Sequence, residues 1–155
     1  MESALRWIAT ILRDLDVPFL ISGGLAARLY GGTRPLADID IDIPEDRFDD
    51  VWSLVAPYVI FGPARYRDNC WDLMLMTLCY DGQDIDLCGA ESTRVFCRQT
   101  NEWVDLPTNF ENLTLLQIGD VQVPVMNLSD LIEYKSRLLR DVDKLDLNQL
   151  ASLRG

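Results

Sequence analysis

The chain has 155 residues, of which 48% are hydrophobic and 25% charged, and no apolar run approaches the ~20 residues of a membrane span. Its net charge of −11 argues against a standing affinity for nucleic acid, because phosphates are bound by Lys and Arg. Histidine is absent, which excludes Ser-His-Asp hydrolases, Cys-His proteases and His-ligated metal sites. Any chemistry must therefore use carboxylates, arginine, two lysines, backbone amides and metal ions.

The length and the N-terminal residues indicate a one-domain cytoplasmic protein. We expect a single domain over residues 1–155, with residues 128–155 forming a C-terminal helical segment packed on it. Glu2 is acidic and no basic-then-apolar signal pattern is present, so we expect neither export nor a membrane partner. The four cysteines contain no CxxC pair and are expected to be reduced, half-buried thiols.

The first thirty residues predict a helix, a strand and a second helix. Leu5, Ile8 and Leu12 recur at helical spacing and predict a helix with one buried face. "PFLIS" (18–22) predicts a short buried strand, after which a glycine pair turns the chain. "LAARLY" (25–30) predicts a short helix that a second glycine pair ends.

"DIDIDI" (38–43) alternates without a break and predicts a strand with isoleucines on one face and aspartates on the other. Like charges on one face of a strand repel, so this arrangement costs stability unless something neutralises it. Pro44 ends the strand, and apolar residues at positions 48, 51, 52 and 55 predict an amphipathic helix.

Two hairpins and a helix are predicted in the second half of the chain. Residues 73–88 contain an Asp-Gly turn between apolar runs, and residues 113–126 contain a Gly-Asp turn. Ser129 is predicted to cap the final helix. Residues 88–112 lack a clear pattern, and no element is predicted there. The fold class is α/β (α+β), with one mixed central sheet flanked by helices.

Asp38 and Asp40 lie two residues apart on the predicted strand, so their side chains point to the same side. Asp84 and Asp86 have the same spacing in "DIDL". If the two strands lie side by side, three or four carboxylates meet, enough for two magnesium or manganese ions. Asp42 lies one step beyond the pair and is expected in solvent. The alternative is a purely structural acidic strand.

The glycine pair before the strand suggests a phosphate site. Gly23 and Gly24 follow a strand and open a helix, so their amides can approach phosphate oxygens without a Cβ between them. Ser22 offers a hydroxyl to phosphate or metal, and Arg34 can reach phosphate or position the strand.

This order of motifs resembles the nucleotidyltransferase superfamily, which has the DNA polymerase beta-like fold. The resemblance lies in "ISGG", thirteen intervening residues and "DID". The run "GGLAARLYGGTRPLADID" is similar to the minimal bacterial branch that contains antibiotic nucleotidyltransferases and AbiEii-type toxins, except that Leu36 stands where that branch has threonine. The tail "DLIEYKSRLLRDVDKLD" is a weaker likeness to the same branch.

The resemblance implies residue roles. Asp38 and Asp40 would hold the metal ions and Asp86, favoured over Asp84, would be the third ligand and the base toward the acceptor. Lys135 would approach the nucleotide phosphates; the alternative is a solvated lysine.

The implied activity is transfer of a nucleoside monophosphate from a nucleoside triphosphate, ATP among them, to an acceptor hydroxyl. The acidic composition favours a cationic small-molecule acceptor, with protein or RNA as the other options. A catalytically silent nucleotide sensor, or part of a toxin–antitoxin-like module, is the alternative function. The chain leaves little room for a separate acceptor-binding domain, which leaves a homodimer or a lost function open.

Overall fold

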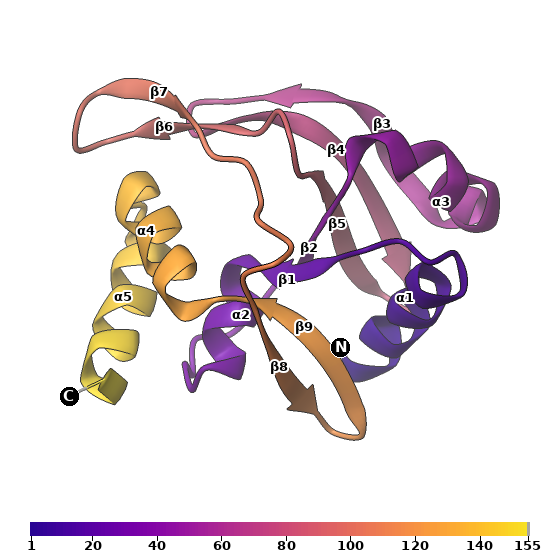
Figure 1. The fold of residues 1–155 in the computed structure, drawn as a ribbon, viewed down its shortest axis with the longest axis horizontal. Helices are drawn as coiled ribbons and strands as arrows, with labels where there is room; N and C mark the ends of the chain where they lie inside the picture. Colours follow the sequence, from indigo (N-terminus) through magenta and orange to yellow (C-terminus); the bar gives the residue numbers. More distant parts are fainter. Residues whose placement is uncertain (155) are drawn as a thin grey trace.

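A computed structural model describes residues 1–154, which form one mixed sheet of nine strands with helices on both sides (Figure 1). The strand order is β7-β6-β4-β5-β2-β1-β9-β8, and β3 pairs with β4 beside this path. The pairs β2–β5 and β1–β9 are parallel, and the other pairs are antiparallel. The predicted mixed central sheet flanked by helices is confirmed.

The elements predicted from periodicity and turn residues are present, together with further strands. The strands are β1 (Leu20–Ser22), β2 (Asp38–Ile43), β3 (Val59–Arg67), β4 (Trp71–Tyr80), β5 (Gln83–Gly89), β6 (Arg94–Cys97), β7 (Glu102–Asp105), β8 (Leu113–Ile118) and β9 (Val121–Met126). The helices are α1 (Glu2–Asp14), α2 (Gly23–Leu29), α3 (Phe48–Val55), α4 (Leu128–Leu138) and α5 (Asp141–Arg154), with 3₁₀ turns at Glu45–Arg47 and Ala56–Tyr58.

The sequence did not predict β3, β6 or β7. The first contains a Gly-Pro pair, which interrupts strand alternation, and the other two are only four residues long. Trp52 lies on the exposed side of α3, at 41% exposure, although it was counted on the apolar face. The cap of α4 is Asn127 rather than Ser129, since the Asn127 side chain accepts the Ser129 N–H.

The isoleucines of β2 anchor the centre of the sheet. Ile39, Ile41 and Ile43 are all 0% exposed and belong to one buried cluster with the apolar face of α1. Each such side chain contributes about 1.5–3 kcal/mol through burial. A slip of the strand by one residue would turn the aspartates into this core, so the apolar face fixes the register. The aspartates are thereby held on the opposite face.

The tail of the chain forms two helices instead of one. Leu139 has a left-handed backbone conformation (φ +46°), which ends α4, and α5 begins two residues later. Both helices contact each other and α2, on the side of the sheet away from α1 and α3 (Figure 1). Gly155, the last residue of the predicted domain and of its tail segment, lies outside the described residues. Within residues 1–154, no helix combines the length and the apolar character needed to cross a membrane.

Candidate metal and nucleotide site

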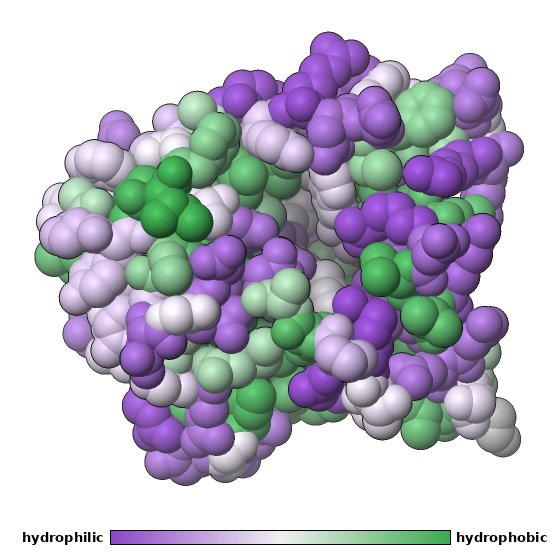
Figure 2. Space-filling view, turned by 180° about the vertical axis from the view of Figure 1, so that it is seen from behind, coloured by the Kyte–Doolittle hydropathy of each residue, from purple (hydrophilic) through white to green (hydrophobic). Residues whose placement is uncertain are grey.

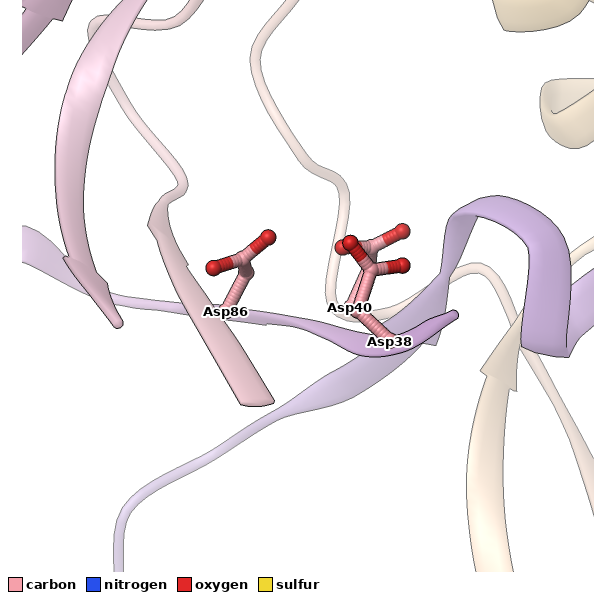
Figure 3. A group of neighbouring side chains, drawn as sticks. All are labelled: Asp38, Asp40 and Asp86. Atoms are coloured by element: carbon pink, nitrogen blue, oxygen red, sulfur yellow. The ribbon is translucent and has the colours of Figure 1, made fainter. Parts of the chain in front are cut away.

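The two DID stretches lie side by side in parallel, with Asp38 opposite Asp84 and Asp40 opposite Asp86. The carboxylate oxygens of Asp38, Asp40 and Asp86 come within 4.8 Å of one another. Figure 3 shows the three carboxyl groups on the same side of the sheet, two from β2 and one from β5. The structure thus brings together three of the four carboxylates predicted as metal ligands, and the fourth, Asp84, is not among them.

The two other candidate carboxylates lie outside this cluster. Asp84 is on the same face of β5 as Asp86, but it lies at the beginning of the strand and is exposed. Asp42, expected in solvent, is only 9% exposed and accepts hydrogen bonds from Ser22 Oγ at 3.0 Å and Thr108 Oγ1 at 2.7 Å. The Ser22 hydroxyl therefore holds a neighbouring carboxyl group rather than pointing freely at a ligand.

The carboxylate cluster is electrostatically strained. Burial, followed by the charges of Asp38 and Asp86, raises the pKa of Asp40 well above its ordinary value. Burial also raises the pKa of Asp86, while a 2.6 Å hydrogen bond from Thr77 Oγ1 opposes this rise. Three carboxylates are hard oxygen donors and fit Mg²⁺ or Mn²⁺ better than a soft metal. A divalent cation at this cluster would remove the repulsion.

Burial raises the pKa of Asp42 to about 6, against the opposing hydrogen bonds from Thr108 and Ser22. Through its hydrogen bonds from Ser22 and Thr108, the Asp42 carboxyl links β2 to the end of β1 and to the segment before β8. No sequence pattern indicated the contact, because Thr108 lies far along the chain in the unpatterned stretch.

Gly23 lets the backbone lie close to the cluster. It has φ +60°, and a Cβ at this position would lie 2.1 Å from Asp40 Oδ2. Both the positive φ and the lack of space for a Cβ therefore require glycine at this position. Gly24 is less confined, since its Cβ would meet the end of a flexible side chain, Arg34 Nη2, at 2.7 Å. The glycine pair begins α2 directly instead of forming a separate turn.

A cleft of about 440 Å³ opens above the cluster. Its lining includes seven predicted site residues: Ser22, Gly23, Gly24, Arg34, Asp38, Asp40 and Asp86. Seen from behind, the surface is hollowed between the side formed by α4 and α5 and the side formed by the sheet (Figure 2).

The sequence analysis missed part of the lining of this cleft. Phe61, Tyr66 and Trp71 line it from β3 and β4, while Tyr134 and Arg140 line it from the tail. The aromatic residues could not be assigned because β3 was not predicted. Arg140 belongs to the tail motif, but its role was not specified there.

Lys135 lies behind the cleft wall. Its side chain is 1% exposed, and its Nζ is 3.3 Å from Asp143 Oδ1 and 2.9 Å from Asp146 Oδ2. The Arg34 guanidinium contacts the same Asp146 carboxylate through Nε and Nη2, each at 3.0 Å. Lys135 is therefore a buried, paired lysine and not the solvated one that was the alternative. Direct contact between Lys135 and phosphate stays a prediction.

Acid is expected to remove the stabilisation that Asp146 contributes. Burial raises the pKa of Asp146, but hydrogen bonds from Arg34 and Lys135 outweigh it and hold this pKa below its ordinary value. A carboxyl of this kind stabilises the fold above its unfolded pKa of about 3.9, and the effect disappears as pH falls through the folded pKa.

We therefore expect Asp146→Asn to lower the free energy of unfolding by about 3 kcal/mol at neutral pH. The difference from wild type should begin to shrink below about pH 4, where the carboxyl of the unfolded chain takes up a proton, and should vanish once the pH lies below the lowered pKa of the folded state. Urea unfolding of wild type and Asp146→Asn, from neutral pH down to below about pH 4, measures the difference in the free energy of unfolding. A difference that does not change with pH would contradict the expectation.

No protein-family model and no curated protein sequence matches the chain. Its structure is similar to solved nucleotidyltransferases. A candidate nucleotidyltransferase from Thermotoga maritima gives a TM-score of 0.69 at 19% identity, over 97% of this chain and 94% of its own. The lincosamide antibiotic adenylyltransferase LnuA, with lincomycin bound, gives 0.65 at 15% identity, over 99% of this chain and 98% of its own.

The enzyme ANT(2'')-Ia, in complex with adenylyl-2''-tobramycin, gives a TM-score of 0.64 at 14% identity, over 99% of this chain and 88% of its own. This chain has the nucleotidyltransferase fold. The fold inferred from "ISGG" and "DID" is confirmed, and antibiotic adenylyltransferases, which were among the expected relatives, share it.

Proposed function

We propose that the protein is a metal-dependent nucleotidyltransferase that transfers a nucleoside monophosphate from a nucleoside triphosphate to an acceptor hydroxyl and releases pyrophosphate. The observation that carries this proposal is the cluster of Asp38, Asp40 and Asp86 beside the Gly23–Gly24 backbone, at the base of a cleft in a nucleotidyltransferase fold. Because nucleoside triphosphates are metabolites of the cytoplasm, the proposal places the reaction there.

Asp38, Asp40 and Asp86 would hold Mg²⁺, with Mn²⁺ as the alternative. Two bound ions would orient the phosphates and stabilise the attacking and leaving oxygens of an in-line displacement. The fold supplies the positioning on which catalysis of this type depends, since β2 and β5 fix all three carboxylates. Asp86, whose pKa is raised mainly by burial, would accept the proton of the acceptor hydroxyl at its carboxylate.

The nucleotide would lie along the glycine side of the cleft. Ser22, Gly23 and Gly24 line that side, and their backbone can approach phosphate oxygens closely. Arg34 lines it as well and carries positive charge, while Lys135 stands behind Arg34 across the Asp146 carboxylate. These five residues are the proposed nucleotide-binding set.

The acceptor is proposed to be a small molecule. Two structural neighbours are solved with antibiotic-derived ligands, lincomycin in one and adenylyl-2''-tobramycin in the other. The net charge of −11 favours a cationic acceptor over nucleic acid. Phe61, Tyr66 and Trp71 offer ring faces on the wall opposite the glycines, where an acceptor would meet Asp86.

Titration calorimetry with each of the four NTPs, in the presence and absence of Mg²⁺, tests the proposal. We expect binding that requires Mg²⁺ and that Asp86→Asn weakens by at least about 100-fold, as expected for loss of a charged ligand. Asp84→Asn is the matched control, because it removes the same charge two residues away, outside the cluster. Its binding should stay within about threefold of wild type.

Folded wild-type protein that binds none of the four NTPs with Mg²⁺ would refute the proposal. If Asp84→Asn abolished binding and Asp86→Asn did not, the proposed ligand set would be wrong, although the activity would stand.

A further inference from the structure

Two arginines on one wall of the cleft are each held by a carboxylate of α5. Arg34 contacts Asp146 through Nε and Nη2, each at 3.0 Å. Arg140 contacts Asp143 through Nε at 2.7 Å and Nη2 at 3.1 Å, and its backbone N–H donates to the same carboxylate at 3.0 Å. Both arginines line the cleft, and both contacts are of the two-pronged type that fixes the plane of a guanidinium.

A single buried lysine joins the two pairs. Lys135 Nζ contacts Asp143 at 3.3 Å and Asp146 at 2.9 Å, and these three side chains are at most 2% exposed. Three positive and two negative charges thus form one network with an excess of positive charge. Buried ions are tolerated only when they are paired. Removing the Lys135 ammonium would leave the Asp143 and Asp146 carboxylates with less positive charge beside them, and each would then pull its arginine away from the cleft.

Arg140 retains donors for a ligand. A guanidinium has five N–H donors, and within residues 1–154 the structure gives Arg140 side-chain hydrogen bonds only from Nε and Nη2. The group lies 5.5 Å from the Trp71 ring, which supports its orientation from the other side. Its side chain is 35% exposed, whereas the carboxylate beneath it is 0% exposed. The unused N–H groups therefore belong to the exposed part of the pair.

We propose that Arg34 and Arg140 together bind the phosphate chain of the nucleotide from this wall of the cleft, and that Lys135 is a positioning residue that holds both through Asp146 and Asp143. The proposal rests on the proposed function, because it concerns how the same nucleotide is bound. It gives Lys135 an indirect role in place of the direct phosphate contact that the sequence resemblance implied.

Phosphate is the ligand chemistry that fits this pair. The guanidinium fork matches phosphate oxygens, and arginine stays charged where lysine shifts its pKa on burial. The same cleft contains the cluster of Asp38, Asp40 and Asp86, so a polyanion bound there needs compensating cations from the protein as well as metal ions. In a chain of net charge −11, this pair supplies them.

The test compares two ligands that differ only in phosphate number: the NTP that wild type binds tightest among the four, and its monophosphate, both with Mg²⁺. Arg34→Gln and Arg140→Gln should each weaken NTP binding by about 10- to 100-fold and NMP binding by much less. Arg98→Gln, an exposed arginine directly after β6, removes the same charge outside the cleft lining and should change neither affinity.

Lys135→Met tests the positioning role through a double-mutant cycle with Arg140→Gln. Alone, it should reduce the NTP-over-NMP preference by about tenfold; in the Arg140→Gln background this effect should largely vanish. Should Lys135→Met fail to fold by circular dichroism, Asp146→Asn replaces it in a cycle with Arg34→Gln, since it breaks the same network at the other pair.

The outcomes separate the two proposals. If wild type binds no NTP, the proposed function fails, and the arginine assignment fails with it. If wild type binds an NTP but the arginine variants weaken NTP and NMP equally, only the phosphate assignment is wrong. If the effects of Lys135→Met and Arg140→Gln multiply, Lys135 does not act through Arg140, and its positioning role is overturned.

Discussion

Asp40→Asn is expected to abolish Mg²⁺-dependent nucleotide binding and, in the same protein, to increase the stability of the metal-free state. Asp40 is partly buried and stands within 4.8 Å of two other carboxylates. Its pKa is raised well above the ordinary value, first by burial and then by the charges of Asp38 and Asp86. Above its unfolded pKa of about 3.9, the ionised carboxyl therefore destabilises the fold, and an amide of the same shape does not.

We expect Asp40→Asn to increase the free energy of unfolding by about 1–2 kcal/mol at neutral pH in EDTA. Because a bound ion stabilises only the state that binds it, Mg²⁺ should raise the melting temperature of wild type and leave the variant unchanged. Nucleotide affinity in Mg²⁺ should fall by at least about 100-fold. Stability and function thus move in opposite directions at one residue.

Thermal unfolding in EDTA and in Mg²⁺, together with calorimetric titration of the NTP, measures both effects. Asp84→Asn is the matched control; it should shift the free energy of unfolding by less than about 0.5 kcal/mol in either buffer. An Asp40→Asn protein that is less stable than wild type in EDTA would show that the carboxylate makes a favourable contact in the metal-free state, and the repulsion argument would fail.

The carboxylate cluster was predictable because it depends on a period of two. Alternation alone places Asp38 and Asp40 on one face, and the Asp-Gly turn between β4 and β5 makes the second DID stretch a strand. What alternation cannot provide is the register between strands distant in sequence. The choice between Asp84 and Asp86 came from family resemblance, and the β2–β5 pairing places Asp86 opposite Asp40, where the cluster forms.

The rest of the site depends on contacts that no local pattern encodes. Asp42 looked like a solvent residue, and it is buried because Thr108, 66 positions later, donates to it. From its position in the predicted helix, Lys135 could equally have been a solvated lysine. It is buried because α5 folds back and brings Asp143 and Asp146 to it. In both cases a tertiary hydrogen bond compensates the burial of a charged or polar group, which sequence spacing cannot reveal.

Gly23→Ala is expected to damage the site although it adds only one methyl group. The residue has φ +60°, which costs a residue with a side chain about 1–2 kcal/mol. The new Cβ would also lie 2.1 Å from Asp40 Oδ2, a distance at which one of the two groups must move. Moving Asp40 opens the carboxylate cluster, and moving Gly23 displaces the start of α2.

Gly82→Ala separates these two causes. Gly82 has φ +75° in the β4–β5 turn, and the structure places nothing within 4 Å of its would-be Cβ. It should therefore show the backbone strain alone, about 1 kcal/mol, with unchanged nucleotide affinity. Gly23→Ala should lose at least about 2 kcal/mol and bind NTP with Mg²⁺ at least about 100-fold more weakly.

Urea unfolding and NTP titration of the two variants provide the comparison. The decisive quantity is the difference in affinity between them, because both carry the same strain and only one carries the contact with Asp40. If Gly23→Ala bound NTP as well as Gly82→Ala does, the close approach of the Gly23 backbone would have no part in nucleotide binding. The site would then depend on the carboxylates and the arginine wall alone.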